Sequence, residues 1–416
     1  MSASVELLAQ EAKSASRVLA LSSRAKKDAA LRAMAQALRR SAPKILEVNA
    51  EETKAAAASG ETKAFVDRLR LDQTRLDAIA DALDHVATLP DPVGVTTDFA
   101  LRPNGLRIRR MRVPLGVVAI IYESRPGVTA DAAGLCVKSG NACLLRGGRE
   151  AIATNALIAA ALREGLKEAG LPPESVGFVD NPDRAAVGRL LQLDQFIDLV
   201  IPRGGPELTR AVRKQSAIPV LAHDKGLCHT FVDRDADLEM AERIALNAKV
   251  SRPGVCNAME TLLVHEAVAG KLLPSLACRY DDAGVELRGC PKTVALLGGI
   301  KAATDEDWDT EYLDLILSIK IVASLDEAIA HIGRHGTGLA EAIVTGNPAS
   351  AERFQREVDA GAVYWNASTR FTDGGEFGLG AEMGISTQKL HARGPVALEG
   401  LTCEKFVVDG SGQVRA

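Results

Sequence analysis

Between residues 117 and 221 the sequence alternates short apolar runs with longer stretches rich in Ala and Leu, and this alternation restricts the fold more than any other feature. The apolar runs have the length and composition of buried strands, and each intervening stretch is long enough for a helix. Strands separated by helices pair in parallel, so the sequence predicts an α/β fold with a doubly wound sheet. The five predicted strands cover residues 117–122, 142–145, 176–179, 197–201 and 218–221.

Two turns of this predicted sheet carry the same motif. Arg146-Gly-Gly-Arg-Glu150 follows the second strand, and Arg203-Gly-Gly-Pro-Glu207 follows the fourth. Each motif places a cation and two glycines before a helix, whose free N–H groups and positive dipole end attract phosphate. A Gly-Gly turn can also simply separate a strand from a helix, but two copies in one sheet favour a nucleotide site. The candidate cofactor residues are Arg146, Gly147, Gly148, Arg149, Arg203, Gly204 and Gly205.

The nature of the nucleotide follows from the same turns. The usual Gly-x-Gly-x-x-Gly fingerprint is absent, which disfavours an ordinary Rossmann oxidoreductase without excluding a nucleotide at these helix starts. Arg146 and Arg149 together would neutralise an additional 2′-phosphate. We therefore expect NADPH rather than NADH.

Cys256 differs from the other cysteines in its surroundings. It lies in a polar Gly/Pro loop, Asn247-Ala-Lys-Val-Ser-Arg-Pro-Gly-Val-Cys-Asn257, directly before an apolar strand at 260–265. Lys249 and Arg252 precede it, and nearby cations favour the nucleophilic thiolate. An isolated cysteine is more often an inert core residue. That alternative suits the other six better, namely Cys136, Cys143, Cys228, Cys278, Cys290 and Cys403.

Composition restricts the class of function. The 416 residues carry a net charge of −4 and 25% charged side chains, which is typical of a globular protein of two or three domains. With only 4% aromatic residues and no basic excess, nucleic-acid binding is not expected. Seven irregularly spaced cysteines and no signal-peptide pattern favour a reducing, cytoplasmic location. No apolar run reaches the roughly 18 residues of a membrane span.

The N-terminal region has a different pattern from the predicted sheet. Residues 1 to about 95 predict helices, with periodic stretches at 24–40, 43–58 and 74–87. Asn104-Gly105 then joins two alternating segments, which is a hairpin signal. The hairpin is rich in arginine, and such a ribbon often pairs with another subunit, so a homo-oligomer is expected.

Several histidines suggest metal binding by composition alone. His331 and His335 have helical spacing, but no third ligand is near in the sequence and the pair ends a helix, where imidazole suits the free carbonyls. His223-Asp224 and Cys228-His229 are better explained as loop and strand residues. We expect no metal site. The glycine-rich segment 376–384 follows no strand and is interpreted as a loop over a cleft.

Longer motifs carry a family resemblance. The order Val113-Pro-Leu-Gly-Val-Val, Ala142-Cys-Leu-Leu-Arg-Gly-Gly, Cys256-Asn, Asp309-Thr-Glu-Tyr312 and Phe377-Gly-Leu-Gly resembles the aldehyde dehydrogenase superfamily. More narrowly, the chain resembles the γ-glutamyl phosphate reductases (glutamate-5-semialdehyde dehydrogenases) over nearly its whole length. The motifs are Ile121-Tyr-Glu-Ser-Arg-Pro126, Leu199-Val-Ile-Pro-Arg-Gly-Gly205, Val363-Tyr-Trp-Asn-Ala-Ser-Thr-Arg-Phe-Thr-Asp-Gly-Gly375 and Gly384-Ile-Ser-Thr-Gln-Lys-Leu-His-Ala-Arg-Gly-Pro395.

The resemblance implies roles for single residues. Cys256 becomes the nucleophile of an acyl-enzyme thioester, and Asn257 and the Cys256 N–H become candidate oxyanion neighbours. Ser124 stands where the superfamily has an asparagine. The remaining implied contacts are Arg146 with the adenosine ribose, Gly204 and Gly205 at the pyrophosphate helix, and Glu311 with the nicotinamide ribose.

The chain departs from the superfamily in lacking a residue that activates water for hydrolysis of the thioester. Hydrolytic aldehyde dehydrogenases carry a water-activating glutamate where this chain has Val220-Leu-Ala-His-Asp-Lys-Gly226, which contains none. The resemblance therefore implies a thioester that reacts with phosphate, and Asp224 is the one nearby carboxylate that would change this expectation. For the α-carboxylate of the substrate, Arg370 is the expected partner and Arg252 the second choice.

The resemblance implies a complete function. L-glutamate 5-phosphate is reduced by NADPH to L-glutamate 5-semialdehyde, the second step of proline biosynthesis, in functional coupling with glutamate 5-kinase. Two alternatives remain. A coenzyme A-acylating aldehyde dehydrogenase also needs no water-activating base, but would lack the segment 366–373. A catalytically silent scaffold of the same fold is disfavoured by the intact Cys256 loop.

The same comparison suggests a division of the chain into functional parts. The expected parts are an NADPH-binding domain (1–96 and 113–224), a catalytic domain (225–385), and an oligomerisation hairpin and C-terminal arm (97–112 and 400–416).

Overall fold

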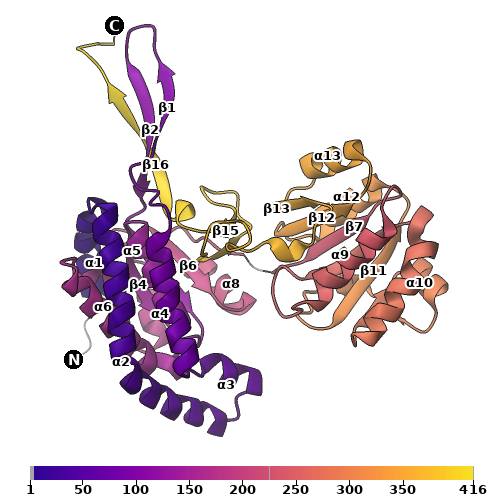
Figure 1. Cartoon of the computed structure of the whole chain (residues 1–416), viewed down its shortest axis with the longest axis horizontal. Coiled ribbons are helices and arrows are strands. Elements are labelled where there is room, and N and C mark those ends of the chain that lie inside the picture. Colours follow the sequence, from indigo (N-terminus) through magenta and orange to yellow (C-terminus); the bar gives the residue numbers. More distant parts are fainter. Residues whose placement is uncertain (1–3, 224, 416) are drawn as a thin grey trace. The chain divides into compact units, whose positions relative to one another are not determined.

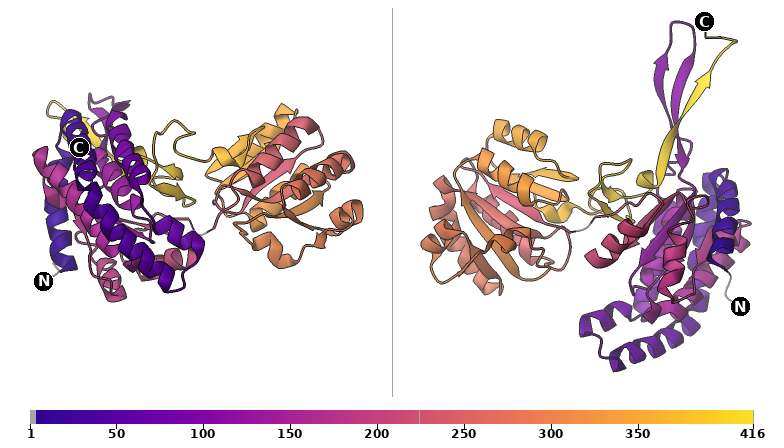
Figure 2. Two further views of the ribbon diagram at one scale, coloured as in Figure 1. Left: turned by 60° about the horizontal axis from the view of Figure 1, so that its bottom comes forward. Right: turned by 180° about the vertical axis from the view of Figure 1, so that it is seen from behind.

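A computed structural model describes residues 4–223 and 225–415 (Figures 1 and 2). The chain forms two compact units. Unit 1 contains residues 1–222, 379–384 and 396–416, and unit 2 contains residues 223–378 and 385–395. Within the described ranges, no helix has both the length and the apolar character needed to cross a membrane.

Unit 1 is built around a parallel sheet with the strand order β5-β4-β3-β6. Its strands and helices alternate along the chain, as the pattern of apolar runs predicts, and β3 is buried along its whole length. The strands are β3 (Val117–Tyr122), β4 (Ala142–Arg146), β5 (Val176–Phe178) and β6 (Leu199–Arg203). The helices are α5 (Gly127–Lys138), α6 (Ile152–Glu168), α7 (Arg184–Leu190) and α8 (Pro206–Gln215).

The predicted fifth strand at 218–221 is wrong. This segment contributes one isolated bridge, between Val200 and Val220. Pro219 lies inside the segment and has no N–H, so it can accept a hydrogen bond from Val200 but cannot donate to extend a ladder. Proline thus limits the sheet of unit 1 to four strands.

Helices α1 (Val5–Ala20), α2 (Arg24–Ala58), α3 (Lys63–Leu69) and α4 (Gln73–Thr88) precede the sheet. The two stretches predicted at 24–40 and 43–58 form one helix, α2, which continues through Pro43. An internal proline costs about 3 kcal/mol. The buried side chains of Leu31, Leu38 and Ile45 lie on both sides of it, and α2 packs along α4 and α6 over this length. Apolar burial on both sides of Pro43 offsets that cost.

A three-stranded antiparallel ribbon also belongs to unit 1. The predicted hairpin is confirmed as β1 (Thr96–Leu101) and β2 (Arg107–Pro114), with Gly105 in the turn at φ 86°. The last strand of the chain, β16 (Thr402–Asp409), pairs with the other edge of β2. Figure 1 shows the ribbon standing out from the helices of unit 1.

Unit 2 contains a seven-stranded sheet in the order β10-β9-β11-β8-β7-β12-β13, and all its pairs are parallel. The strands are β7 (Cys228–Val232), β8 (Met259–His265), β9 (Glu286–Gly289), β10 (Lys301–Ala302), β11 (Ile316–Val322), β12 (Ala340–Val344) and β13 (Ala362–Trp365). The helices are α9 (Leu238–Val250), α10 (Glu266–Asp282), α11 (Pro291–Leu297), α12 (Leu325–His335) and α13 (Pro348–Glu357). One apolar core includes residues of α9 and α10, and a second includes residues of α12 and α13.

The shorter elements complete the fold. Strands β14 (Gly384–Ser386) and β15 (Gly394–Val396) form a two-stranded sheet. The 3₁₀ turns are η1 (Arg149–Ala151), η2 (Pro173–Ser175), η3 (Asp305–Asp309), η4 (Thr369–Phe371) and η5 (Glu399–Leu401).

Candidate active site

Cys256 lies in the loop that joins α9 to β8 in unit 2. Its side chain is half-buried and packs against a small apolar cluster that includes Tyr364 and Ile385. The thiol of Cys228 donates to the carbonyl oxygen of Cys256 at 3.3 Å. The loop thus holds Cys256 beside the amino ends of β7 and β8, with its carbonyl oxygen hydrogen-bonded.

Gly226 lies directly against the Cys256 backbone. A Cβ at position 226 would lie 2.0 Å from the Cys256 carbonyl oxygen and 2.6 Å from its Cα. The N–H of Gly226 donates to Glu311 Oε1 at 2.9 Å. Only glycine permits this approach, so the structure brings Cys256 and Glu311 together through Gly226.

A buried ion pair closes the base of the Cys256 loop. Lys249 lies in the last turn of α9, Glu260 is the second residue of β8, and the ammonium donates to Glu260 Oε2 at 2.6 Å. Both side chains are almost fully buried, at 0% and 1% exposure. Lys249 is therefore matched by a carboxylate, and its effect on the Cys256 thiolate stays a prediction.

The carboxylate of Glu260 has a second partner. Its Oε1 accepts the N–H of Leu313 at 3.2 Å, and Leu313 adopts φ 53°. Burial raises the pKa of Glu260 to about 7, although Lys249 acts in the opposite direction. Glu260 sits at an irregular register between β7 and β8, typical of a bulge that redirects a side chain. The pair thus ties the Cys256 loop to the segment that follows Glu311.

Asn257 and Arg370 are joined across the loop. The Arg370 guanidinium donates through Nη1 to Asn257 Oδ1 and through Nε to Ser251 Oγ at 3.2 Å. The Asn257 amide donates to the carbonyl of Thr372 at 2.8 Å. Burial lowers the pKa of Arg370, and the neighbouring charge of Arg252 lowers it further. Asn257 thus binds the arginine segment to the cysteine loop, and its role at an oxyanion stays a prediction.

The first predicted cofactor turn, in unit 1, is tightly packed. Arg146 donates to the carbonyls of Gly147 (2.7 Å) and Pro182 (2.9 Å). Arg149 is exposed and pairs with Glu150 at 2.9 Å. A Cβ on Gly147 or Gly148 would collide with neighbouring side chains, including Ser124 at 2.3 Å from position 148. Glycines here allow the turn to pack against the end of β3.

Ser124 lies at that same end of β3. Its hydroxyl donates to Glu150 Oε2 at 2.8 Å, and the side chain is 5% exposed. The structure therefore gives Ser124 a partner in the Arg146 turn. Its cofactor role stays a prediction.

The second predicted turn begins α8. The N–H of Gly205, the residue that caps this helix, donates to Glu123 Oε1 at 2.8 Å. A Cβ on Gly204 would lie 2.6 Å from the same carboxylate. A negatively charged group thus already occupies the α8 N-terminus, the position predicted for pyrophosphate. β3 and β6 are neighbours, so Glu123 and Arg203 lie together at the carboxyl ends of these two strands.

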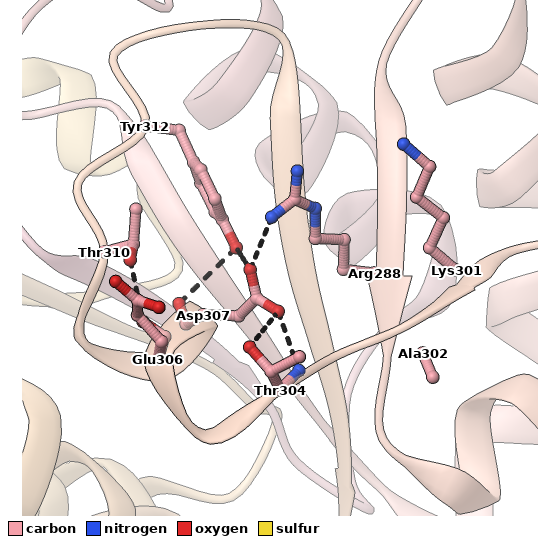
Figure 3. Close-up of a pocket in the computed structure, with 8 residues that line it drawn as sticks. All are labelled: Arg288, Lys301, Ala302, Thr304, Glu306, Asp307, Thr310 and Tyr312. Carbon is pink, nitrogen blue, oxygen red and sulfur yellow. Dashed lines mark hydrogen bonds and ion pairs between the residues drawn. The ribbon is translucent and has the colours of Figure 1, made fainter.

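Asp307 and its neighbours line a hollow of about 430 Å³ in unit 2 (Figure 3). Asp307 accepts hydrogen bonds from Arg288 (2.6 Å), Tyr312 (2.8 Å) and the N–H and hydroxyl of Thr304 (2.7 and 2.9 Å). Burial favours a higher pKa for this carboxyl, but these donors outweigh it and lower the pKa to about 2. The hollow is lined by groups already bonded to one another, which favours a structural role.

The histidines of α12 lie close together. The rings of His331 and His335 are 4.5 Å apart, and His335 Nδ1 lies 2.8 Å from Asp309 Oδ1. Burial lowers the pKa of His331 to about 2. Over residues 4–223 and 225–415, no group of three or more His, Cys, Asp or Glu side chains has an arrangement suited to a metal ion. Asp224, whose carboxylate bears on water activation, lies outside the described residues.

The chain is similar to known proteins in sequence and in fold. The model of the "Aldehyde dehydrogenase family" matches residues 1–288 and 305–389. A γ-glutamyl phosphate reductase of Caldanaerobacter subterraneus is 52% identical over 411 residues, 99% of each chain. A crystal structure of the γ-glutamyl phosphate reductase of Thermotoga maritima is 47% identical, with a TM-score of 0.98 over 100% of both chains. An acetylating aldehyde dehydrogenase of Geobacillus thermoglucosidasius, 19% identical with a TM-score of 0.68 over 99% and 97% of the chains, shares the fold.

The chain belongs to the aldehyde dehydrogenase family, and its α/β fold is the one predicted. Within this family it groups with the γ-glutamyl phosphate reductases, as the long motifs indicate.

Three residues of the site were missed by sequence reasoning. In the sequence, Gly226 ends a segment without a glutamate, Glu123 lies within a longer motif, and Glu260 starts a predicted strand, and none of these contexts predicts a contact. Their partners are Cys256, Gly205 and Lys249 respectively. No local pattern points to these three residues, because Gly226 stands between Lys225 and an apolar residue and the two glutamates are ordinary members of their segments.

Proposed function

We propose that this chain reduces L-glutamate 5-phosphate to L-glutamate 5-semialdehyde and phosphate with NADPH, in the cytoplasm, as the second step of proline biosynthesis. The observation that carries the proposal is the half-buried Cys256 in a loop spanned by the Arg370 guanidinium. The names of relatives that match the chain end to end support the same substrate.

The chemistry assigned to Cys256 is nucleophilic. Its thiolate attacks the acyl carbon, a C–S bond forms, the acyl C–O bond to phosphate breaks, and phosphate leaves with the electron pair. The Cys256 N–H is the proposed donor to the oxyanion, because the Asn257 amide is engaged with Thr372. NADPH, when bound, supplies the hydride that reduces the thioester. Collapse of the thiohemiacetal then returns the thiolate of Cys256 and releases the aldehyde.

The test uses the reverse reaction. Within residues 220–223 no carboxylate is present to activate water, so the thioester should wait for phosphate. In phosphate-free buffer, semialdehyde and NADP should give one NADPH per Cys256 and then stop, and added phosphate should restore turnover. Sustained phosphate-independent turnover that releases glutamate would mean a hydrolytic dehydrogenase. Coenzyme A replaces phosphate in a parallel assay, and turnover with it alone would favour the acylating enzyme.

The cofactor site is proposed to comprise Ser124, Arg146, Gly147, Gly148, Arg149, Arg203, Gly204, Gly205 and Glu311. The support for the pyrophosphate position is the N–H of Gly205, which donates to the Glu123 carboxylate at the start of α8 and would equally suit a phosphate oxygen. Preference for the 2′-phosphate is assigned to Arg146 and Arg149. Replacing both with Ala should raise KM for NADPH far more than for NADH. Equal increases would give the arginines a role common to both cofactors.

The ribbon is the proposed oligomer contact. It comprises the hairpin of residues 97–112 and the C-terminal arm of residues 400–416. Phe99 and Phe406 are 53% and 59% exposed and lie edge to face, with Arg110 over both rings. Exposed aromatic side chains on a ribbon suit a second copy of the chain. Sedimentation of Phe406→Asp against the unaltered chain tests this contact. Coupling to glutamate 5-kinase is proposed only because that enzyme would supply the acyl phosphate.

A further inference from the structure

Arg370 is held at both ends of the Cys256 loop. Its Nε donates to Ser251 Oγ at 3.2 Å, and its Nη1 donates to Asn257 Oδ1. Ser251 begins the loop, and Asn257 directly follows the cysteine. The guanidinium is therefore fixed beside the nucleophile rather than at a distance from it.

A second cation lies near the first. Arg252 is exposed, follows Ser251 in the chain, and lies close enough for its charge to act on Arg370. The acid whose charge acts on Arg370 is Asp373, and its carboxylate already accepts the N–H groups of Gly375 (2.8 Å) and Glu376 (3.4 Å). Two like charges beside a half-buried thiol repel each other, and an anion with more than one charge relieves that repulsion.

Glutamyl phosphate has two anionic ends at different distances from the reacting carbon. The phosphoryl group is bonded through one oxygen to the acyl carbon that Cys256 attacks. The α-carboxylate is separated from that carbon by three further carbons. A cation fixed to the residue next to the nucleophile is therefore better placed for the phosphoryl group.

We propose that Arg370 and Arg252 form the binding site of the phosphoryl group, which is inorganic phosphate in the reverse reaction. This rests on the proposed function and differs from the sequence-based expectation, in which the same arginines hold the α-carboxylate. As Cys256 Sγ bonds to the acyl carbon and the C–O bond breaks, the electron pair moves onto the phosphate oxygen. The guanidinium groups stabilise that charge where it develops, without a proton transfer.

Steady-state kinetics in the aldehyde-oxidising direction test the site, because phosphate and semialdehyde are then separate substrates. Arg370→Gln should raise KM for inorganic phosphate by about 10- to 100-fold, in line with the loss of a charge-assisted contact. KM for the semialdehyde should change less than about twofold. Arg252→Gln should give a smaller shift of the same kind, and Arg370→Lys should recover part of the loss because it keeps the charge but not the two-pronged geometry.

The control is Arg279→Gln, an arginine on α10 that pairs with Glu242 and lies outside the loop. It should leave both KM values unchanged. A raised KM for semialdehyde with an unchanged KM for phosphate would overturn the proposal and assign the arginines to the α-carboxylate. In phosphate-free buffer, Arg370→Gln should still form one NADPH per Cys256. If it does not, and Arg370→Lys does not recover this NADPH, the proposal is overturned, because Arg370 then only shapes the loop. Absence of a burst in the unaltered chain would instead count against the proposed function.

Discussion

Glu260 and Asp307 lie in the same unit, and each is hydrogen-bonded to a basic side chain, yet their pKa values shift in opposite directions. Glu260 is buried with Lys249, and burial raises its pKa to about 7. Asp307 accepts four hydrogen bonds, and its pKa falls to about 2 despite burial. Burial outweighs the donors at Glu260, whereas the four donors outweigh burial at Asp307, so the balance between burial and donors sets the direction of each pKa shift.

Tyr312 connects these two regions. Its hydroxyl donates to Asp307, and its ring centroid lies 5.2 Å from the Arg288 guanidinium and 5.9 Å from the Lys249 ammonium. The Asp307 cluster is saturated with internal bonds, whereas the Glu260 pair underlies a loop with a nucleophile. We therefore expect substitutions near Asp307 to change stability, and substitutions around the Cys256 loop to change activity as well.

The largest effect is expected at Cys256. Cys256→Ala should reduce turnover in both directions by at least about a thousandfold, because no other group carries the acyl intermediate. The melting temperature should stay close to that of the unaltered chain, since the side chain is only half-buried. Turnover and thermal unfolding are measured together, with the exposed Cys278→Ala as control. Residual activity above about a thousandth would remove Cys256 as the nucleophile.

Breaking the buried pair should have the next largest effect. Lys249→Met leaves the Glu260 carboxylate buried without its cation. We expect the free energy of unfolding to fall by about 3–5 kcal/mol, the usual cost of breaking a buried ion pair. Replacing both residues, as Lys249→Met with Glu260→Leu, should recover most of the loss. Urea unfolding gives the free energies, and Lys292→Met, at an exposed ion pair, should change little. Equal losses in the single and double variants would show that packing, not the unpaired charge, sets the cost.

Gly226→Ala tests the close approach to the nucleophile. The added Cβ would lie 2.0 Å from the Cys256 carbonyl oxygen, so the loop must move. A displacement of about 1 Å at a reacting group can cost about 100-fold in rate, and a loss of that order in kcat is expected. Gly254→Ala is the matched control in the same loop, because its Cβ would meet only Leu313 O at 3.7 Å. If both variants keep full activity, the approach has no catalytic importance.

The smallest expected effect concerns Asp307. Because its pKa in the folded chain lies below the usual value of 3.8, its stabilisation is present above about pH 4 and is lost as pH falls towards 2. Asp307→Asn should therefore destabilise by about 2 kcal/mol at pH 7, and the difference from the unaltered chain should shrink below about pH 4. Urea unfolding across this range measures it, with activity at neutral pH largely kept. A difference independent of pH would mean that the charge of Asp307 contributes nothing.

Local pattern was enough to predict much of the fold. Buried strands such as Val117–Tyr122 and the Asn104-Gly105 hairpin depend on neighbouring residues, and both are present. Local reasoning was wrong at two prolines. It predicted a strand where Pro219 prevents one, and it divided a helix that continues through Pro43. Pro219 stops a strand for want of an N–H, while Pro43 does not stop α2, because packing on both sides outweighs its cost.

The site was less accessible to sequence reasoning. The position of Cys256 in a loop before a strand could be predicted, since it depends on adjacent residues. The pairing of Lys249 with Glu260, eleven residues apart, depends on how the loop closes. The approach of Gly226 to Cys256 and the bond from Gly205 to Glu123 join segments that meet only in the folded chain. Such contacts follow from tertiary packing, which no local pattern encodes.

The position of β16 has a consequence for biosynthesis. The ribbon pairs β2 with the last strand of the chain, and Arg109 meets Asp409 across 300 positions. At about 5–20 residues per second, β16 is synthesised roughly 15 to 60 s after the hairpin. During that interval the nascent chain presents β2 as an open strand edge, which invites association with other chains. The arginines of β2 carry positive charge along that edge. Before β16 is made, the charge opposes pairing of β2 with other chains, and afterwards the same side chains pair with β16.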